Sequence, residues 1–458
     1  MSQSSHLISS ELRAQALKIF KAGVLAADPY LAVKQAISIE DNLIKLALNA
    51  TTDKNQFISK DWSKVHIIAF GKAAYAMTQA VLDIIPSALI ANDSILVTHQ
   101  ENTATLSNIN VLIAGHPLPD ANGLLAAKKC AAIASNAKPD ELILVLISGG
   151  GSALIPYPVD SITLAEKIST TDLLLASGAN IHEINCVRKH LSQLKGGLMA
   201  KLAAPTDLHA IILSDVLNDD LSVIASGPTV ADSTTFTNAI HILNKYKLWD
   251  KAPQTVKDYL EQGQNGLVSE TPKAKDNVFA NTSHTLIGSN AISLKETVKT
   301  AGDLGFKTQI YNHQLSGEAS QVAEDWVKYA KNLCDTGLNK PIALLAGGET
   351  TVTVKGKGKG GRNQEMCLAF AIAAEKQALV TDWVFLSGGT DGRDGPTDAA
   401  GGLIDNNSLT RMLTLEKNPY SLLSDNNAYA ALQSSDDLLI TGATGTNVAD
   451  LQVLLLHP

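Results

Sequence analysis

The stretch VHIIAFGKAAYAMTQAVLDII, residues 65–85, decides the fold class of this chain. It begins with an apolar run, broken only by His66, of the kind that forms a buried strand. One glycine and Lys72 follow, and the remaining residues have the apolar spacing of a helix. A strand followed directly by a helix is the first half of a βαβ unit, so the stretch predicts an α/β fold with a parallel sheet.

Strand-length apolar runs recur along the chain and alternate with segments of helical period. Residues 350–356 follow the preceding run after almost no loop, which predicts an antiparallel hairpin and therefore a mixed sheet in the second half. Ahead of the first strand, Asp28 and Pro29 have the order of a helix N-cap followed by proline at the first helical position. The expected strands are residues 65–70, 94–99, 110–116, 141–148, 209–215, 285–290, 307–313, 341–349, 350–356, 383–389, 401–405 and 451–457.

Two domains are expected, because 458 residues exceed the size of one ordinary core. The stretch from residue 262 to residue 281 is polar, lacks periodicity and carries Gly, Asn, Pro and Lys. We place the boundary there, which gives an N-terminal α/β domain at residues 1–262 and a C-terminal α/β domain at residues 263–458.

Composition excludes several classes of protein. The net charge is -8 and no basic stripe is present, so the pattern of a nucleic-acid-binding protein is missing. No apolar run reaches the ~18 residues of a membrane-spanning helix. The first residues lack a signal-peptide pattern, so we expect a cytoplasmic protein. The four cysteines lie far apart without C-x-x-C spacing, which favours neither a disulfide framework nor a zinc site.

Glycine clusters stand at the carboxyl ends of the expected strands, where open α/β sheets bind their ligands. In LISGGGSALIPYP a strand is followed by three glycines, whose N–H groups can form an anion-binding nest with a helix N-terminus beyond it. A tight strand-to-helix turn is the alternative interpretation. The residues of this loop are Ser148, Gly149, Gly150, Gly151 and Ser152.

Lys72 follows the first strand after a single glycine. A lysine in the first turn of a helix opposes the helix dipole, so this position favours an anionic partner over a solvated surface role. The surrounding sequence matches neither G-x-x-x-x-G-K-[ST] nor G-x-G-x-x-G. A P-loop and a dinucleotide site therefore both lack their main support.

The segment EINCVRKHLSQLKGG, residues 183–197, is densely basic. On a continuous helix Arg188, Ser192 and Lys195 would fall at i, i+4 and i+7 and share a face. An ordinary basic surface is the alternative, and His190 by itself favours a structural role over that of a base. Further along, Asp215 ends a strand, where a carboxylate suits Mg²⁺ or a substrate hydroxyl.

The C-terminal half carries the densest motif, GGETTVTVKGKGKGGRNQE. Glu349 follows a strand, a glycine–lysine loop covers residues 355–361, and Arg362 opens a helix. We expect the loop to be mobile until phosphate oxygens engage its lysines.

A second glycine-rich loop, SGGTDGRDGPTDAAGG, brings three aspartates close together in the sequence. Asp391 is a candidate ligand, whereas Asp394 and Asp398 could equally be turn residues. In TGATGTNVAD, Thr444 and Asn447 offer polar contacts. Carboxylates, cations and a basic loop are what phosphoryl transfer needs, because the charge of the transferring group must be neutralised.

Eight segments together resemble the type-II glycerate kinases, the glycerate 2-kinase family with a C-terminal MOFRL module. They are GKAAYAM, GHPLPDANG, LISGGGSALIPYP, NCVRKHLSQLKGG, LSDVLNDDLSVIASGPT, GGETTVTVKGKGKGGRNQE, SGGTDGRDGPTDAAGG and TGATGTNVAD, in the family's order. The resemblance implies a Rossmann-like N-terminal domain, a C-terminal α/β domain with a mixed sheet, and an active site in the cleft between them. It also implies Mg²⁺-dependent transfer of the ATP γ-phosphate to D-glycerate, mostly giving 2-phosphoglycerate.

The motifs and the resemblance together define an expected site. Catalytic roles are expected for Lys72, Arg362 and Asp215, and metal binding for Asp391 and Glu349. Nucleotide or phosphate binding is expected for Ser148, Gly149, Gly150, Gly151, Ser152, Lys189, Lys195, Thr444 and Asn447.

Several alternatives stay open at this point. The chain departs from the family pattern at Leu217-Asn218, Ala443 and Ala449, which affects loop geometry but no charged position. A hydroxypyruvate reductase is the competing enzyme, and a non-catalytic protein that binds a small anion is the competing binding function. Which hydroxyl is phosphorylated, which nucleotide is preferred and whether the chain forms a homodimer are left open.

Overall fold

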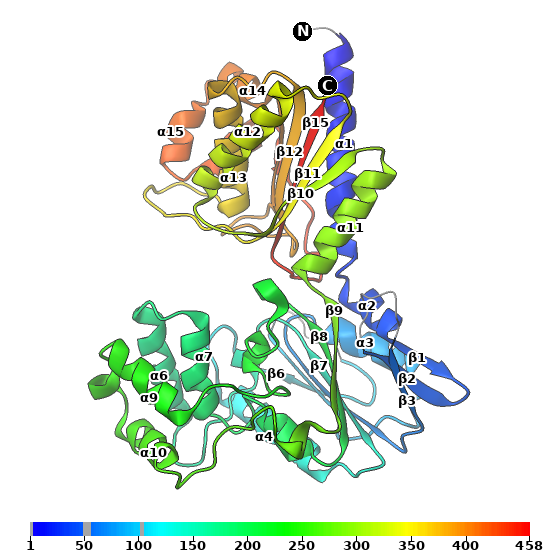
Figure 1. Cartoon of the computed structure of the whole chain (residues 1–458), viewed down its shortest axis with the longest axis vertical. Helices are drawn as coiled ribbons and strands as arrows, with labels where there is room; N and C mark the ends of the chain where they lie inside the picture. The colour runs from blue at the N-terminus through cyan, green and yellow to red at the C-terminus, as the bar shows by residue number, and fades with distance from the viewer. Residues whose placement is uncertain (1–2, 49–55, 101–104) are drawn as a thin grey trace. The chain divides into compact units, whose positions relative to one another are not determined.

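The computed structural model describes residues 3–48, 56–100 and 105–458, and they form two compact units (Figure 1). The N-terminal unit is Pro29–Ile287, and the C-terminal unit combines Met1–Asp28 with Gly288–Pro458. The expected boundary at residues 262–263 does not coincide with this division. Strand β9 (Thr282–Gly288) joins the first sheet, whereas helix α1 (Gln3–Leu25) packs with the C-terminal half.

The N-terminal unit is built on the expected parallel sheet, in the order β6-β5-β4-β7-β8-β9. Strands β6, β5, β4, β7 and β8 pair in parallel, and Phe70, Ile147 and Ile212 stand side by side in the register. The carboxyl ends of the central strands therefore share one edge. The strand bounds are β4 Val65–Phe70, β5 Ile95–Thr98, β6 Asn110–Ile113, β7 Leu142–Ile147 and β8 Asp207–Leu213.

Helices and a small second sheet surround this sheet. The expected start of α2 at Asp28-Pro29 is confirmed, since α2 begins at Pro29. A three-stranded antiparallel sheet, β1 (Ile37–Glu40), β2 (Leu43–Ala47) and β3 (Phe57–Lys60), was not expected from the sequence. The helices are α2 Pro29–Ala36, α3 Ala74–Ile84, α4 Ala121–Asn136, α5 Gly151–Leu154, α6 Leu164–Ala176, α7 Ile181–His190, α8 Leu198–Ala203, α9 Phe236–Lys245 and α10 Gln254–Gln264, with 3₁₀ turns at Leu217–Asp219, Ile224–Ser226, Trp249–Lys251 and Asn277–Phe279.

Apolar packing in the described residues of the N-terminal unit includes a core on the parallel sheet and a separate core among its outer helices. Alternate residues of the strands, such as Val145 and Ile147, pack with α4 and α8 on one face of the sheet. A second core joins α6, α7, α9 and α10 with residues of the loops beside them, and Phe236 and Leu260 are buried in it. Burying a large apolar side chain contributes about 1.5–3 kcal/mol, so this group of helices has its own source of stability.

The C-terminal unit contains a six-stranded mixed sheet in the order β10-β11-β15-β12-β13-β14. Only β10 and β11 pair in parallel among the pairs of this sheet in the described residues; the rest are antiparallel. The expected strand at residues 350–356 is wrong, because β10 and β15 already occupy both sides of β11. The bounds are β10 Lys307–Leu315, β11 Ile342–Gly348, β12 Asp382–Gly389, β13 Gly401–Asp405, β14 Leu438–Leu439 and β15 Asp450–His457.

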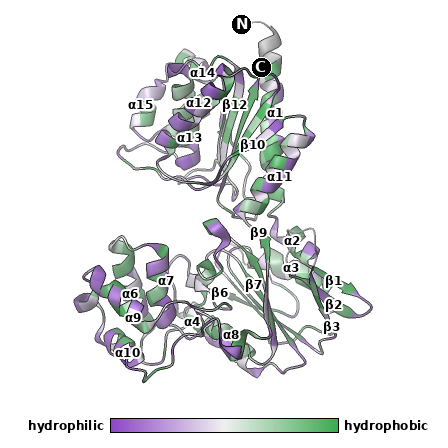
Figure 2. Cartoon of the chain, viewed as in Figure 1, coloured by the Kyte–Doolittle hydropathy of each residue, from purple (hydrophilic) through white to green (hydrophobic). Residues whose placement is uncertain are grey.

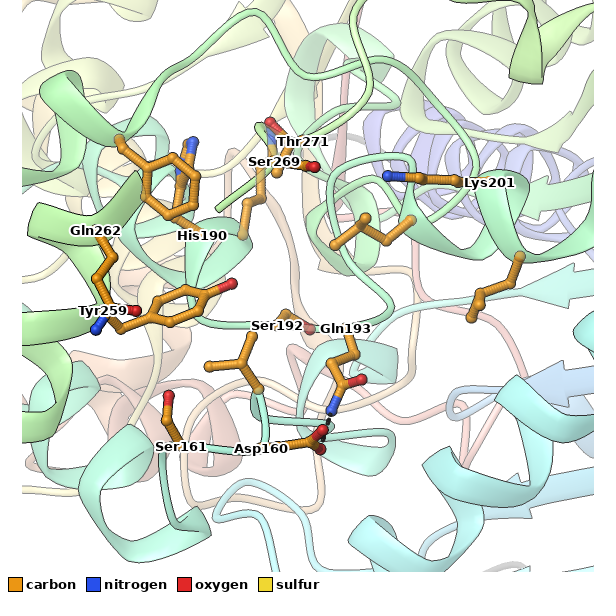
Figure 3. A pocket seen from close by; sticks show the side chains of 15 residues that line it. Asp160, Ser161, His190, Ser192, Gln193, Lys201, Tyr259, Gln262, Ser269 and Thr271 are labelled. Carbon is orange, nitrogen blue, oxygen red and sulfur yellow. Dashed lines mark hydrogen bonds between the residues drawn. The ribbon is translucent and has the colours of Figure 1, made fainter. Parts of the chain in front are cut away.

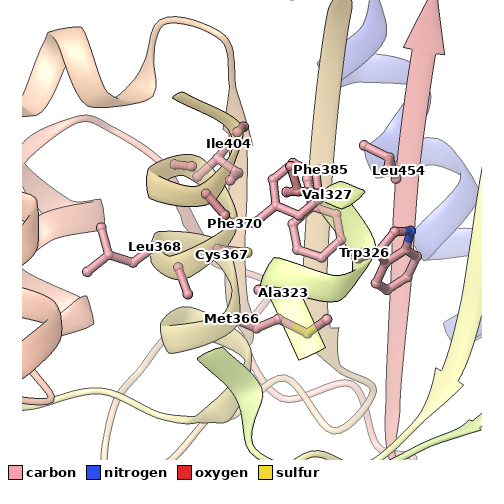
Figure 4. Packing of buried hydrophobic residues seen from close by; sticks show 14 of the residues in the cluster. Ala323, Trp326, Val327, Met366, Cys367, Leu368, Phe370, Phe385, Ile404 and Leu454 are labelled. Carbon is pink, nitrogen blue, oxygen red and sulfur yellow. The ribbon is translucent and has the colours of Figure 1, made fainter. Parts of the chain in front are cut away.

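Helices cover both faces of the mixed sheet. On one face, Trp326 and Phe370 pack against Phe385 and Leu454 (Figure 4). On the other, Phe20 of α1 joins residues of α11 and the opposite side chains of the strands. The helices are α1 Gln3–Leu25, α11 Asn290–Asp303, α12 Ala319–Asp335, α13 Arg362–Lys376, α14 Ser408–Thr414, α15 Pro419–Ser424 and α16 Ala428–Ser434.

Hydropathy follows these layers. Strands of both sheets are largely hydrophobic, whereas the outer helices are mixed (Figure 2). Within residues 3–48, 56–100 and 105–458, no helix is long and apolar enough to cross a membrane.

Candidate active site

The carboxyl edge of the parallel sheet brings Lys72 and the glycine loop together. Strand β4 ends at Phe70 and β7 ends at Ile147, so Gly71 and Ser148 emerge side by side. A Cβ on Gly71, whose φ is +126°, would lie 2.2 Å from the Ser148 hydroxyl oxygen, so only glycine fits there. The Ser148 hydroxyl accepts a hydrogen bond from the backbone of Ala73 at 3.0 Å.

Lys72 and Asp215 flank the glycines of this loop. The Lys72 N–H donates to the carbonyl of Gly149 at 2.9 Å. A Cβ on Gly149 would lie 2.2 Å from Oδ2 of Asp215, which shows how closely the carboxylate approaches the loop. Burial raises the pKa of Asp215, and the positive charge of Lys72 opposes that rise.

His116 completes this group, although the sequence predicted no role for it. Its Nε2 lies 2.9 Å from the position of a Cβ on Gly150, and Cγ of Lys72 lies 3.6 Å from the same position. The ring of His99 lies 5.9 Å from that of His116. The motif GHPLPDANG carried the signal, because His116 follows a strand of the same sheet edge.

One helix-based expectation about this edge is wrong, and a second is met only by a short helix. Lys72 does not stand in the first turn of a helix, because α3 begins at Ala74 with Ala73 as its N-cap. The helix after the glycines, α5, has 4 residues, so its dipole adds little to the loop. An anion at this loop would therefore be bound mainly by the loop's own N–H groups and by nearby cations.

Ser152 lies between two cations of the basic segment. Arg188 Nη2 donates to the Ser152 hydroxyl at 2.7 Å, and Lys195 Nζ donates to the same oxygen at 2.7 Å. Burial, followed by the charges of Arg188 and Lys167, lowers the pKa of Lys195 well below its usual value. In the part of the chain that the structure describes, neither Arg188 nor Lys195 forms an ion pair with a carboxylate. An anion bound at Ser152 would favour the charged forms of both side chains, which burial opposes.

Arg188 and Lys195 meet at Ser152 without sharing a helix face, which was the expected reason. Helix α7 ends at His190, so Ser192 and Lys195 are not on a continuous helix with Arg188. Lys195 reaches Ser152 from the turn that follows, while the Ser192 hydroxyl donates to the carbonyl of Tyr157. Lys189 is paired with buried Asp232 at 3.3 Å, so its expected phosphate contact remains a prediction.

In the C-terminal unit, Arg362 opens α13 and is held by two carboxylates. Its Nε and Nη2 donate to Oδ2 and Oδ1 of Asp450 at 2.6 and 2.9 Å. Nη1 lies 3.0 Å from Oε1 of Glu349. Burial opposes a charged guanidinium, but the hydrogen bonds and charge of Asp450 raise the pKa of Arg362. The sequence predicted no role for Asp450, although this residue ends the TGATGTNVAD motif and begins β15.

Asp394 has a structural role, one of the two possibilities that the sequence left open: its side chain caps the start of α13. Its carboxylate accepts from the N–H groups of Asn363 and Gln364 at 3.2 and 2.9 Å, which satisfies the first turn of α13. Burial raises the pKa of Asp394 to about 6. Asp398 accepts a hydrogen bond from the hydroxyl of Tyr429.

Asp391 belongs to the same glycine-rich loop as Asp394 and contacts the TGATGTNVAD loop. Its Oδ1 accepts from the N–H of Arg393 at 3.0 Å, while its carbonyl accepts from the N–H of Thr444. Thr444 also donates to the carbonyl of Thr390 at 2.6 Å, and Asn447 accepts from Ala449. Among the residues described, no group of three or more His, Cys, Asp or Glu has a metal-binding arrangement.

The glycine–lysine loop makes several protein contacts, and its expected mobility before phosphate binds remains a prediction. The N–H groups of Lys355 and Gly356 donate to Oδ1 of Asn426, and that of Lys357 donates to Asp425. A Cβ on Gly356 would lie 2.2 Å from the carbonyl oxygen of Asp425. The glycines thus allow close packing on residues 425–427, and the three lysine side chains remain exposed.

The expected residues fall into two groups, one in each unit. Lys72, the loop of residues 148–152, Lys195 and Asp215 lie together in the N-terminal unit. Arg362, Glu349 and Asp391 lie in the C-terminal unit with Thr444 and Asn447. The cleft implied by the resemblance stays a prediction.

Known proteins match this chain over nearly its whole length. Residues 15–261 match the family described as a domain of unknown function (DUF4147), and residues 342–450 match the MOFRL family. A protein named glycerate 2-kinase from Pyrococcus horikoshii is 40% identical over 98% of each chain.

A solved structure and a differently named relative add to this comparison. The crystal structure of glycerate kinase from Thermotoga maritima has a TM-score of 0.84 and 36% identity, covering 98% of this chain and 100% of that one. A protein named putative hydroxypyruvate reductase from Agrobacterium vitis is 36% identical over 96% of this chain and 93% of its own length. The family matches and the identity over almost the whole chain show that this protein belongs to the glycerate 2-kinase family.

Proposed function

We propose that this protein transfers the γ-phosphate of ATP to D-glycerate and releases 2-phosphoglycerate and ADP. The observation that carries the proposal is the pair Arg188 and Lys195 at the Ser152 end of the glycine loop, for which the described residues provide no carboxylate partner. Lys72 and Asp215 flank the same loop. Relatives named glycerate kinase support the choice of substrate.

The N-terminal unit would bind an anionic group of the reactants. Arg188, Lys195 and the hydroxyl of Ser152 supply charge and hydrogen bonds that suit a carboxylate or a phosphate. Glycine N–H groups of the loop can approach the same anion closely. Lys72, on the other side of the loop, would neutralise charge that moves during transfer.

Asp215 is the proposed proton acceptor. The 2-hydroxyl oxygen of glycerate attacks the γ-phosphorus, the bond from that phosphorus to the bridging oxygen breaks, and ADP leaves with the bonding electrons. The hydroxyl proton passes to the Asp215 carboxylate, whose pKa is raised by burial. A raised pKa favours this role, because a base works best when its pKa is near the working pH.

Arg362, which lies in the C-terminal unit, would stabilise the negative charge of a reactant's phosphate group. Asp450 and Glu349 engage three of its nitrogens, which fixes the plane of the guanidinium. Two of its five N–H donors are not used by these contacts, so it can still bind an oxygen of a reactant.

A carboxylate of the C-terminal unit and the phosphates of ATP would together supply the oxygen ligands of Mg²⁺. Hard carboxylate oxygens suit Mg²⁺, which usually takes one or two carboxylates and completes its shell with phosphates and water. Asp391 would provide such an oxygen, whereas Glu349 is already engaged with Arg362. When bound, Mg²⁺ would neutralise part of the phosphate charge.

Hydroxypyruvate reduction is the second candidate, because relatives from Agrobacterium vitis carry that name. No turn that directly follows a strand of the parallel sheet has the G-x-G-x-x-G pattern of a dinucleotide site. The match at Gly356, Gly358 and Gly361 does not directly follow a strand, and its backbone packs on residues 425–427. We further propose a cytoplasmic location and leave a homodimer as an option for the assembly.

One assay separates the two activities. The protein is incubated with D-glycerate, ATP and Mg²⁺, and ADP is measured by chromatography. A parallel sample receives hydroxypyruvate and NADH, and NADH oxidation is followed by absorbance. We expect glycerate-dependent ADP that disappears with EDTA and returns with Mg²⁺. NADH oxidation without ADP formation would contradict the kinase and support the reductase.

A further inference from the structure

A large cavity in the N-terminal unit lies apart from the candidate active site. Its volume is about 690 Å³, within the range of ligand pockets in proteins. The walls come from α7, α8, α9 and α10 and the loops beside them (Figure 3). Of the expected site residues, Lys189 is part of its lining, whereas Lys72, Asp215 and the loop of residues 148–152 are not.

One side of the cavity is suited to a negative charge. Lys201 lies there with the hydroxyl-bearing Ser269 and Thr271, while His190 lies across the cavity, its ring 4.7 Å from that of Phe236 (Figure 3). Burial alone would lower the pKa of His190, but hydrogen bonds to the Cys186 carbonyl and to Glu270 raise it to about 9, so the imidazole is positive at neutral pH.

Most of the charges that line the cavity are already matched. His190 faces Glu270 at 3.2 Å, and Lys189 faces Asp232 at 3.3 Å. Lys201 is exposed at the end of α8 and forms no ion pair within the residues that the structure describes. Its charge can therefore be neutralised by an incoming anion.

The other side of the cavity is suited to a flat ring that carries hydrogen-bond donors. The ring of Tyr259 stands beside that of Phe236, with 5.8 Å between the ring centres. Asp160 lies on the same side and accepts a hydrogen bond from Nε2 of Gln193 at 2.9 Å (Figure 3). A carboxylate there can accept hydrogen bonds from an amino group or from sugar hydroxyls.

One chain segment separates this cavity from the candidate active site. In residues 188–195, Arg188 and Lys195 hold Ser152, while the intervening Gln193 lines the cavity. Gln193 is fixed to the preceding loop, through its N–H to Tyr157 at 2.8 Å and through Nε2 to Pro158 at 2.9 Å. A ligand that changes the contacts of Gln193 therefore acts on the segment that positions both cations.

We propose that this cavity binds a nucleoside monophosphate, with its phosphate at Lys201 and its base on Tyr259, and that occupancy alters the active site through residues 188–195. The binding half of the proposal does not depend on the proposed function. The kinetic half rests on it.

Calorimetry with AMP tests the binding half. Wild-type protein should bind AMP, and Lys201→Met and Tyr259→Leu should each weaken binding by about tenfold or more, since each removes a principal contact. Both side chains are at least partly exposed, so the variants should fold, which circular dichroism checks. Lys129→Met, an exposed lysine on α4, is the matched control and should bind like wild type. Adenosine and inorganic phosphate should each bind more weakly than AMP.

Lys72→Met identifies which site AMP occupies. It should leave AMP affinity unchanged within about twofold, because Lys72 does not line the cavity. Loss of AMP binding in Lys72→Met but not in the cavity variants would place AMP in the active site and overturn the proposal. Absence of AMP binding to wild type at millimolar concentration would overturn it as well.

Kinetics test the coupling. AMP should change kcat/KM for glycerate by about fivefold or more, without competing with ATP, in wild type and not in Lys201→Met. Competition with ATP that persists in Lys201→Met would overturn the coupling. A protein without kinase activity leaves the calorimetric test intact, so failure of the function and failure of the site can be told apart.

Discussion

Replacement of Arg362 by alanine should cost stability as well as activity. A cation at the start of a helix would contribute little to packing, and the sequence alone predicts a folding-neutral change. The structure predicts otherwise, because the Arg362 guanidinium donates two hydrogen bonds to Asp450, whose side chain is 0% exposed. Arg362→Ala would leave that carboxylate buried without a partner.

The size of the loss follows from the burial of the pair. Removing one partner of a buried ion pair costs about 3–5 kcal/mol. The Arg362 side chain is 31% exposed, so water screens part of the interaction and the lower end of about 3 kcal/mol applies. At ~1.4 kcal/mol per factor of ten, local opening at the start of α13 should become about 10² times more frequent. Loss of transition-state charge stabilisation should lower kcat/KM by about 10²-fold or more.

A second substitution separates the two losses. In Arg362→Ala/Asp450→Asn the buried charge is gone, so more than half of the lost stability should return while activity stays low. Hydrogen exchange at the α13 amides measures local opening, and ADP release measures activity. Unchanged exchange in Arg362→Ala would refute the dependence of Asp450 on Arg362, and wild-type kinetics would refute its catalytic role.

The remaining predictions concern the N-terminal unit. Lys72→Ala should lower kcat/KM by about 10²-fold with little change in thermal midpoint, and near wild-type kinetics would return Lys72 to an ordinary loop lysine. Gly149→Ala should lower kcat/KM at least tenfold, because its Cβ would lie 2.2 Å from Oδ2 of Asp215. Gly302→Ala, whose Cβ would have its nearest neighbour at 4.0 Å, is the control, and equal kinetics in both variants would sink the argument. The pKa of His190 is raised to about 9, above the ~6.5 of the unfolded chain, so its stabilising effect is full below pH ~6.5 and is lost as the pH rises to about 9. His190→Gln should therefore reduce the free energy of unfolding near pH 6 and not near pH 10, and equal losses at both pH values would contradict this assignment.

Local sequence patterns predicted the parts of the fold that depend on local periodicity. The apolar runs at Val65–Phe70 and Leu142–Ile147 form adjacent parallel strands, and their carboxyl ends bring Lys72 to the glycine loop as expected. The run at residues 350–356 has the alternation of a strand but no free sheet edge beside it. Residues 350–356 cannot pair with β11 because β15 occupies that side of it. Strand β15 lies almost 100 residues later in the chain, so the local sequence pattern does not predict this.

Long-range partners account for what the sequence did not predict. Helix α1 was assigned to the N-terminal domain, yet Phe20 is buried in the core of the C-terminal unit. Asp450 shows no special local pattern, and its role follows from β15 lying between β11 and β12, where it meets Arg362. The glycines of residues 355–361 allow close packing on Asp425, which their spacing alone does not reveal.

Phosphorus NMR of the reaction product tests the central claim most directly. The protein is incubated with D-glycerate, ATP and Mg²⁺, and proton-coupled spectra are recorded as ATP is consumed. A phosphate ester on the 2-hydroxyl is bonded through oxygen to a carbon with one hydrogen, so we expect a doublet that grows in step with ADP. A triplet would indicate phosphorylation of the 3-hydroxyl and contradict the proposed attack by the 2-hydroxyl. If no ester signal forms while ATP and glycerate remain unchanged, the protein is not a glycerate kinase.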